Sequence, residues 1–276
     1  MDRIRLIASD MDATLLNEQS QLPADFEETI HALAELGIRF APASGRPLYT
    51  LEAMFPTLQD ELVFIGDNGG AIRWKGQNLF TSEMSPEGWR ALNRLTREQG
   101  DIAVLCGLES AYVERPFAVH DAVLRHFYTK IEYVDWLEAV AAPADKFTIY
   151  LPQHNAQQAY DTVYASQRSI YSVAVAGECW VDIMNPGVHK GAALQTLGQL
   201  WGLPSESMMA FGDTYNDAEM LRTAKYGFLM ENGSVPLRRN VPFLAPSHRE
   251  AGVMQVLHRV LAQNGCVCPE DFVPAH

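Results

Sequence analysis

The sequence predicts an α/β fold, in which a doubly wound, Rossmann-like parallel-sheet core is interrupted by an inserted α+β domain. In the first and last thirds of the chain, short apolar runs alternate with segments whose apolar residues recur at helical spacing. Short links join these segments, as in parallel sheets covered by helices on both faces. The middle third instead has strand-like runs paired around turn residues. We therefore expect the core at residues 1–79 and 186–276, and the inserted domain at 80–185.

The first third is predicted to run strand, helix, strand, helix, strand. Phe26, Ile30 and Leu33 lie near helical spacing, and Gly37 follows as a residue favoured just beyond a helix end. Pro47 suits the start of the second helix. The expected ranges are 4–9, 24–36, 38–43, 47–55 and 62–66.

Two hairpins mark the middle of the chain, and the alternating pattern returns after them. Turn residues 75–78 and 177–178 separate the two pairs of strand-like runs. Ser85 is predicted to cap a helix through residue 97. The other expected strands are 71–74, 79–83, 147–151, 170–176, 179–184 and 208–211, and the other expected helices are 155–166, 189–201, 217–224 and 251–262. Residues 226–230 and 241–245 form two short apolar runs.

The composition excludes several classes of function. Lys and Arg number 21 against 34 Asp and Glu, so the formal net charge is −13. A chain this acidic, with no basic run, is poorly suited to bind nucleic acid or anionic lipid. No apolar stretch approaches the roughly 18 residues that cross a bilayer, and the N-terminus lacks signal-peptide features. We expect a cytoplasmic protein with no membrane or nucleic-acid partner. Its cysteines are expected to be reduced thiols without metal-ligand spacing: Cys106, Cys179, Cys266 and Cys268.

Asp10 and Asp12 directly follow the first predicted strand, at the edge where open α/β sheets bind ligands. Residues i and i+2 of an ideal strand share a face, so both carboxylates are expected to reach one site. Their mutual repulsion would be relieved by Mg²⁺, which prefers hard oxygen ligands. Taken alone, the pair is equally well explained as two solvated acids at a strand end.

Three further clusters lie at predicted strand ends or helix starts. Ser44-Gly45-Arg46 offers a hydroxyl and an open amide near a helix N-terminus, although Ser44 is also a plausible simple cap. Lys190 begins a helix, where its charge opposes the helix dipole, so an anionic partner is expected, although a surface lysine with its charge in solvent explains the position equally well. Asp213 and Asp217 bracket a turn after a buried strand. The carboxyl ends of parallel strands share one edge, so the four clusters are predicted to converge on one crevice.

Together these motifs resemble the haloacid dehalogenase superfamily of Mg²⁺-dependent phosphohydrolases, in particular its Cof-type (type IIB) subfamily. The resemblance covers nearly the whole chain and rests on residues 10–14, 44–46, 67–69, 190–191, 212–217, Asn232 and 251–253. It implies a phosphatase for a small phosphorylated metabolite, most simply a sugar phosphate. The inserted domain would be a cap that selects the leaving group.

The resemblance also implies roles for individual residues. Asp10 would be the nucleophile that forms an aspartyl-phosphate, and Asp12 the acid and base. Ser44 and Lys190 would hold the transferring phosphoryl group. Asp10, the backbone carbonyl of Asp12, Asp213 and, in support, Asp217 would hold Mg²⁺. The substrate and phosphate periphery would comprise Gly45, Arg46, Asn68, Gly69 and Asn216.

The sequence departs from the family pattern at a few positions. Ala13 replaces the usual Gly, so the loop after Asp12 is expected to be less tolerant of positive φ. Asp67 replaces the commoner Glu, and Glu231-Asn232-Gly233 replaces Gly-Asn-Ala. These positions are expected to surround the substrate, so their differences weaken any inference of this protein's substrate from the family.

Three alternatives remain beside a phosphatase. A phosphomutase or phosphotransferase of the phosphomannomutase type would need a bisphosphate activator. A phosphoryl-sensing switch like a response-regulator receiver is disfavoured by Asp12, because a switch benefits from a slow phospho-aspartate. A catalytically silent phospho-ligand binder is disfavoured by the intact acidic set, although Ala13 keeps it open. The oligomer is expected to be a monomer or homodimer.

Overall fold

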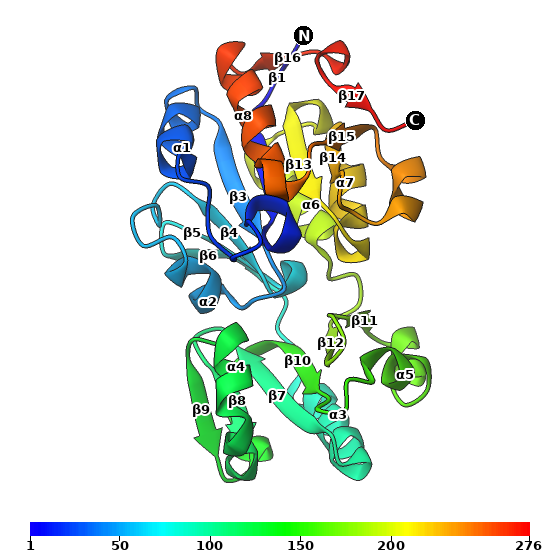
Figure 1. Cartoon of the computed structure of the whole chain (residues 1–276). Coiled ribbons are helices and arrows are strands. Elements are labelled where there is room, and N and C mark those ends of the chain that lie inside the picture. The colour runs from blue at the N-terminus through cyan, green and yellow to red at the C-terminus, as the bar shows by residue number, and fades with distance from the viewer.

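The computed structural model describes residues 1–276 and contains two large β-sheets, which occupy separate parts of the molecule (Figure 1). The larger sheet has nine strands. Their spatial order is β17 (Val273–Pro274), β15 (Phe243–Ala245), β14 (Tyr226–Met230), β13 (Met208–Gly212), β2 (Leu6–Asp10), β3 (Arg39–Ala43), β4 (Val63–Gly66), β5 (Ala71–Trp74) and β6 (Gln77–Thr81).

The centre of this sheet is parallel. Strands β15, β14, β13, β2, β3 and β4 all run in the same direction, whereas β5, β6 and β17 add antiparallel edges. Every residue of β2, β13 and β14 is buried, as expected for strands with helices on both faces. The carboxyl ends of the parallel strands therefore lie along one edge of the core.

Helices cover both faces of the nine-stranded sheet. On one face, α1 (Phe26–Glu35), α2 (Leu48–Ala53) and α8 (Gly252–Ala262) pack in a core that includes Phe26, Leu51 and Leu257. On the other face lie α6 (Lys190–Trp201) and α7 (Ala218–Thr223), which contribute Leu194 and Met220. This layered arrangement confirms the predicted fold class.

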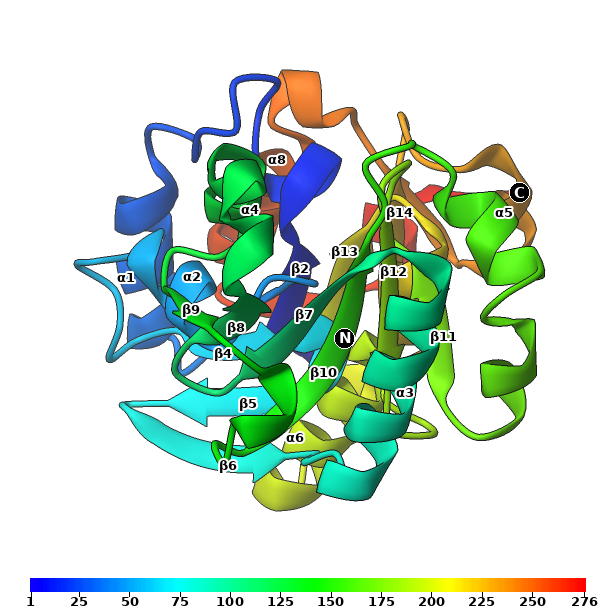
Figure 2. The same ribbon diagram turned by 90° about the horizontal axis from the view of Figure 1, so that it is seen from below.

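The smaller sheet is formed by residues between the two halves of the core. Its strands are β11 (Ser172–Val175), β12 (Trp180–Met184), β10 (Ala144–Tyr150), β7 (Ile102–Gly107), β8 (Ala111–Glu114) and β9 (Ile131–Val134), in spatial order. One face packs on α3 (Pro86–Gln99) and α5 (Ala156–Asp161), and the opposite face packs partly on α4 (Asp121–Phe127). Figure 2, seen from the side of this sheet, shows β7 and β10 across the ends of β2 and β13.

Several expected elements are confirmed, with differences in length. Both hairpins form, as β5–β6 and β11–β12, and the Ser85 hydroxyl caps α3 by accepting a hydrogen bond from the Gly88 amide at 3.0 Å. The helix expected at 155–166 is wrong in extent, because α5 ends at Asp161. The strand expected at 147–151 begins earlier, at Ala144. It includes the charged residues Asp145 and Lys146, which are buried. Strands β7, β8 and β9 and helix α4 were not predicted.

Other expectations have different outcomes. No helix has the length and apolar character needed to span a membrane. All four cysteines are free thiols. The domain boundaries at 79/80 and 185/186 and the cytoplasmic location stay predictions. A short two-stranded ribbon, β1 (Asp2–Arg3) with β16 (Cys266–Val267), ties the C-terminal segment to the N-terminus.

Candidate active site

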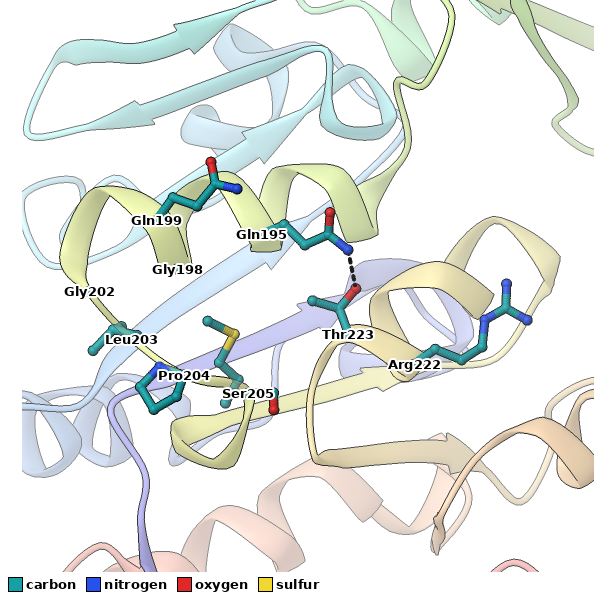
Figure 3. Close-up of a pocket in the computed structure, with 10 residues that line it drawn as sticks. Gln195, Gly198, Gln199, Gly202, Leu203, Pro204, Ser205, Arg222 and Thr223 are labelled. Carbon is teal, nitrogen blue, oxygen red and sulfur yellow. Dashed lines mark hydrogen bonds between the residues drawn. The ribbon is translucent and has the colours of Figure 1, made fainter.

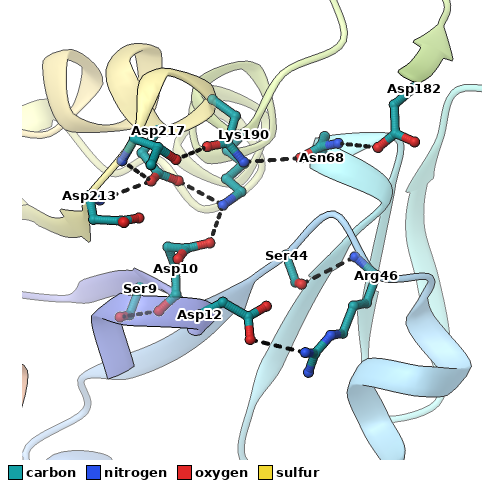
Figure 4. Close-up of polar contacts among 12 residues, drawn as sticks. Ser9, Asp10, Asp12, Ser44, Arg46, Asn68, Asp182, Lys190, Asp213 and Asp217 are labelled. Carbon is teal, nitrogen blue, oxygen red and sulfur yellow. Dashed lines mark hydrogen bonds and ion pairs between the residues drawn. The ribbon is translucent and has the colours of Figure 1, made fainter. Parts of the chain in front are cut away.

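The four sequence clusters converge at the carboxyl edge of the parallel strands (Figure 4). Asp10 ends β2 and Asp213 follows β13, and these two strands are neighbours in the sheet. Ser44 follows β3, which pairs with β2 on its other side. Lys190 enters from the first turn of α6. The predicted convergence therefore follows from strand order, because β13, β2 and β3 are adjacent and parallel.

The Lys190 side chain is fully buried between two carboxylates. Its ammonium group donates to Asp10 Oδ1 and, at 2.6 Å, to Asp217 Oδ1. Burial by itself would lower the pKa of Lys190, but Asp10 and Asp217 outweigh burial and raise that pKa above its ordinary value. The anionic partner that the sequence predicted for Lys190 is thus a pair of aspartates, and the lysine stays charged.

Three carboxylates form a compact acidic group in this crevice. Oxygen atoms of Asp10, Asp213 and Asp217 all lie within 4.8 Å of one another. Burial is the main cause that raises the pKa of Asp10 to about 8, with Asp217 and Asp213 adding to the rise and Lys190 opposing it. Burial and the charge of Asp217 raise the pKa of Asp213 to about 6. One lysine does not neutralise three acids, so the donor set fits a divalent cation that prefers oxygen ligands.

Asp217 has little free ligand capacity of its own. Its Oδ2 accepts the backbone N–H groups of Asp213 at 3.0 Å and Thr214 at 3.1 Å, while Lys190 occupies Oδ1. Gly212 allows this close approach, because a Cβ there would lie 2.4 Å from Asp217 Cβ. The Asp217 side chain therefore holds the turn that carries Asp213.

Asp12 lies outside the acidic group, which corrects the expectation drawn from an ideal strand. The strand ends at Asp10, and residues Met11–Leu15 form a tight turn. The Asp12 carboxylate is 57% exposed and accepts a hydrogen bond from Arg46 Nη2 at 3.0 Å. Asp10 and Asp12 thus face the same crevice from different backbone conformations, one buried and one at its open side (Figure 4).

Ala13 adopts the left-handed conformation that its family position favours for glycine. Its φ is 57°, at a cost of roughly 1–2 kcal/mol relative to a residue in the right-handed region. The Asn232 side chain stabilises this turn, because its Nδ2 donates to Ala13 O at 2.9 Å and its Oδ1 accepts from His248 N at 3.0 Å. Ala13 therefore adopts positive φ at an energetic cost that glycine would not have, and Asn232 is a supporting residue to which the sequence analysis gave no role.

The Ser44 loop is ordered by its own hydroxyl group. Ser44 Oγ accepts the Arg46 backbone N–H at 3.1 Å, and the Arg46 guanidinium also contacts Met54 Sδ at 3.1 Å. Ser44 does not cap the next helix, because Leu48 begins α2 with Pro47 at its N-cap position. The alternative of Ser44 as a simple helix cap is thus wrong. The same loop also carries Arg46, whose guanidinium group donates to Asp12.

Comparison with known proteins identifies the family. Residues 7–257 match the haloacid dehalogenase-like hydrolases. The chain belongs to this family. It is 32% identical over 262 residues to the 5-amino-6-(5-phospho-D-ribitylamino)uracil phosphatase YbjI of Escherichia coli, covering 94% of this chain and 96% of the relative. It is 31% identical over 248 residues to the HMP-PP phosphatase of Cronobacter sakazakii, covering 87% and 89%.

A solved structure agrees with these relatives. The crystal structure of SMU.1108c from Streptococcus mutans superimposes with a TM-score of 0.85 at 29% identity, over 94% of this chain and 99% of the other. The resemblance to the Cof-type haloacid dehalogenase hydrolases is confirmed, and this hydrolase is a phosphatase of phosphoric monoesters.

Asn68, Gly69 and Asn216 lie beside the acidic group of this hydrolase without joining it. Asn68 Nδ2 donates to Asp182 Oδ2 of the smaller sheet at 3.0 Å, and Asn216 Nδ2 lies 3.4 Å from Asn68 Oδ1. Gly69 is required by packing, because a Cβ there would lie 2.6 Å from the His189 carbonyl oxygen. These three residues therefore link the crevice to the smaller sheet and to the start of α6.

Two cavities differ in their relation to the site. One, of about 650 Å³, opens between β11 and the start of α6, and its lining includes Asn68, Asn216, Tyr160 and Tyr215. The other, of about 600 Å³, lies between the end of α6 and α7 (Figure 3). It borders Met208 at the amino end of β13, the sheet edge opposite the acidic group. The first cavity is therefore the one next to the crevice.

Proposed function

We propose that this hydrolase is a Mg²⁺-dependent phosphatase that cleaves small phosphorylated metabolites through an aspartyl-phosphate on Asp10. The observation that carries the proposal is the Asp10 carboxylate. Lys190 holds one of its oxygens, and the carboxylates of Asp213 and Asp217 lie close by. A weak carboxylate nucleophile placed in this way splits one difficult displacement into two easier ones.

The metal would be held mainly by Asp10 and Asp213, together with the backbone carbonyl of Asp12. Asp217 contributes its charge and fixes the Asp213 turn. When bound, Mg²⁺ would neutralise charge on the phosphoryl oxygens and orient them. The raised pKa values of Asp10 and Asp213 indicate carboxylates that gain most from such a cation.

In the first step, an Asp10 oxygen attacks phosphorus while the bond to the leaving alcohol breaks and Asp12 supplies the alcohol with a proton. In the second step, Asp12 takes a proton from water, whose oxygen attacks phosphorus and releases Asp10 and phosphate. Lys190 and Ser44 would hold the phosphoryl oxygens, because transfer depends mainly on positioning and charge neutralisation. The Arg46 contact keeps Asp12 at the open side of the crevice.

The substrate is proposed to be a sugar or sugar-alcohol phosphate. One relative acts on a phosphorylated ribityl compound, according to its name. The cavity beside Asn68 and Asn216 has polar and aromatic lining and a volume of about 650 Å³, which suits a small polar body. Phosphorylated 5-amino-6-ribitylaminouracil is therefore the first compound to test.

The experiment is phosphate release from a panel of phosphorylated sugars, sugar alcohols, nucleotides and cofactors, with Mg²⁺ and with EDTA. We expect release from a few sugar or ribityl phosphates with Mg²⁺ and none with EDTA. Release that is unaffected by EDTA would contradict the metal role. No release, followed by phosphoryl transfer once a bisphosphate activator is added, would instead identify a mutase.

A further inference from the structure

The face of the smaller sheet that meets the core carries a buried charged group. Lys146 and Thr148 on β10 and Asp182 on β12 share this face, because Thr148 pairs with Asp182 across the two strands. Lys146 is 2% exposed and Asp182 is 4% exposed. We call Lys146, Thr148 and Asp182, together with the core residues Asp67 and Asn68, the Lys146 cluster.

The cluster joins the two parts of the molecule through several polar contacts. Lys146 Nζ donates to Gly45 O at 2.6 Å and lies 2.9 Å from Asp67 Oδ1 and 3.7 Å from Asp182 Oδ2. Asp182 accepts from Thr148 Oγ1 at 2.7 Å and from Asn68 Nδ2 at 3.0 Å. Gly45 lies in the loop after β3, between Ser44 and Arg46.

We propose that Lys146 is a positioning residue: its ammonium group fastens the inserted domain to the Gly45 carbonyl and to Asp67, and so sets the position of the Ser44–Arg46 loop. This inference deepens the proposed function and rests on it. The residue acts through the loop, because its buried side chain has no free access to a ligand while the two parts are in contact.

The physical reason is that a buried cation requires partners. Burial alone would lower the pKa of Lys146, but Asp182 and Asp67 outweigh burial and raise that pKa well above its ordinary value. The lysine is therefore charged, and two of its three partners, Gly45 and Asp67, belong to the core. Separating the two parts would leave Lys146 paired only with Asp182 at 3.7 Å.

The hydrogen bond from Lys146 also constrains the loop after β3 at Gly45, between Ser44 and Arg46. The Ser44 amide is bonded to Ile65 O, and Asn68 N is bonded to Ser44 O, so the loops after β3 and β4 are already connected. Lys146 adds the only side-chain hydrogen bond to the Gly45 carbonyl. Loss of this bond would loosen the loop at Gly45, between Ser44 and Arg46, and small displacements of positioning groups cost up to about a hundredfold in rate.

The test uses the full chain and the double variant Lys146→Met/Asp67→Asn. The second substitution removes the carboxylate nearest to Lys146, and Asp182 keeps its hydrogen bonds from Thr148 and Asn68, so the variant is expected to fold. Arg115→Met is the matched control, because it removes an exposed cation paired with Asp135 inside the inserted domain. Two readouts are measured: steady-state kinetics with p-nitrophenyl phosphate and Mg²⁺, and amide hydrogen exchange of residues 44–46.

The proposal predicts that kcat of the double variant falls by about 10- to 100-fold while KM changes much less. Amide exchange at residues 44–46 should accelerate without a matching change in β13 and β14. The control should match the wild type in both readouts. Wild-type kcat with wild-type loop exchange in a folded double variant would overturn the proposal, as would an acceleration spread evenly over the chain.

The two readouts separate this inference from the proposed function. If the wild type does not hydrolyse p-nitrophenyl phosphate or any compound of the metabolite panel, the phosphatase mechanism fails. The exchange data then decide alone: acceleration confined to the loop supports the positioning contact, and unchanged exchange overturns it.

Discussion

Asp10 and Asp12 show how two residues of the same type acquire different surroundings, which suit the two different tasks that we propose for them. Asp10 ends a buried strand beside Lys190, whereas Asp12 follows in a turn and is 57% exposed beside Arg46. The buried carboxylate is held in one orientation, as a nucleophile needs to be. The exposed one is accessible to a leaving alcohol or a water molecule, as an acid and base needs to be.

Replacing the proposed nucleophile tests the first task. Asp10→Asn should lower kcat by roughly a thousandfold or more, because an amide oxygen does not form the aspartyl-phosphate. The fold should persist, since the amide is nearly the same size. Phosphate release and circular dichroism measure the two properties. A folded variant with activity near wild type would remove Asp10 from the mechanism.

Replacing Asp12 tests the second task. Asp12→Asn should slow turnover by about 10²- to 10⁴-fold, because both proton transfers lose their partner. Mg²⁺ affinity should change little, since the side chain lies outside the acidic group. Phosphoenzyme trapped by acid quench and Mg²⁺ titration are the measurements. A parallel loss of metal affinity and rate would make Asp12 a metal ligand through its side chain.

At the scale of elements, the site depends on close packing between the loop after β4 and the start of α6. Gly69 has φ of +99°, and a Cβ on it would meet the His189 carbonyl at 2.6 Å, one residue before Lys190. A residue with a side chain would not allow the two backbone segments to approach this closely. The glycine therefore fixes the distance between the Asn68 turn and the helix that presents Lys190.

Adding one methyl group at this junction should affect both stability and activity. Gly69→Ala is expected to destabilise the protein by about 1–3 kcal/mol through overpacking and to lower kcat by displacing Lys190. Urea unfolding and steady-state kinetics measure these effects. Gly76→Ala is the control, because that glycine also has positive φ but a Cβ there meets nothing within 4 Å. Equal effects of the two variants would assign the loss to backbone strain alone.

At the scale of the whole molecule, the proposed binding of Mg²⁺ by the acidic group should depend on pH. The pKa of Asp10 is raised to about 8 and that of Asp213 to about 6, from ordinary values near 3.8. At pH values between the ordinary pKa and the raised pKa of each group, the ion-free folded protein holds more protons than the unfolded chain. The free energy of unfolding of the ion-free protein should therefore decline as pH rises toward 8, because these carboxyl groups lose their protons. Mg²⁺ would compete with protons for the same carboxylate oxygens.

The increase in melting temperature caused by a fixed Mg²⁺ concentration should therefore be larger at pH 8 than at pH 6. Thermal unfolding with Mg²⁺ and with EDTA at both pH values measures it. The Asp213→Asn variant should lose most of the increment at both pH values. An increment that is independent of pH would contradict metal binding by these carboxylates.

Much of this architecture was predictable from local sequence. The parallel core follows from apolar runs and helix signals such as Gly37 and Pro47, and the convergence of Asp10, Ser44 and Asp213 follows from strand ends. The elements between residues 102 and 134 were missed, although Ile102–Gly107 is a continuous apolar run that suits a buried strand. The position of the Asp12 side chain outside the acidic group was missed because strand periodicity does not apply in the turn that follows the strand.

By itself, the sequence determined the fold class, the family and the set of residues at the crevice, because these depend on local patterns and short motifs. Only the tertiary structure decided that Lys190 is enclosed by Asp10 and Asp217, and that Arg46 pairs with Asp12. It also placed Lys146 against Gly45, 101 positions away in the chain. Such pairings depend on how the inserted domain rests on the core, and charged residues within a strand do not reveal that they are buried until their partners are in place.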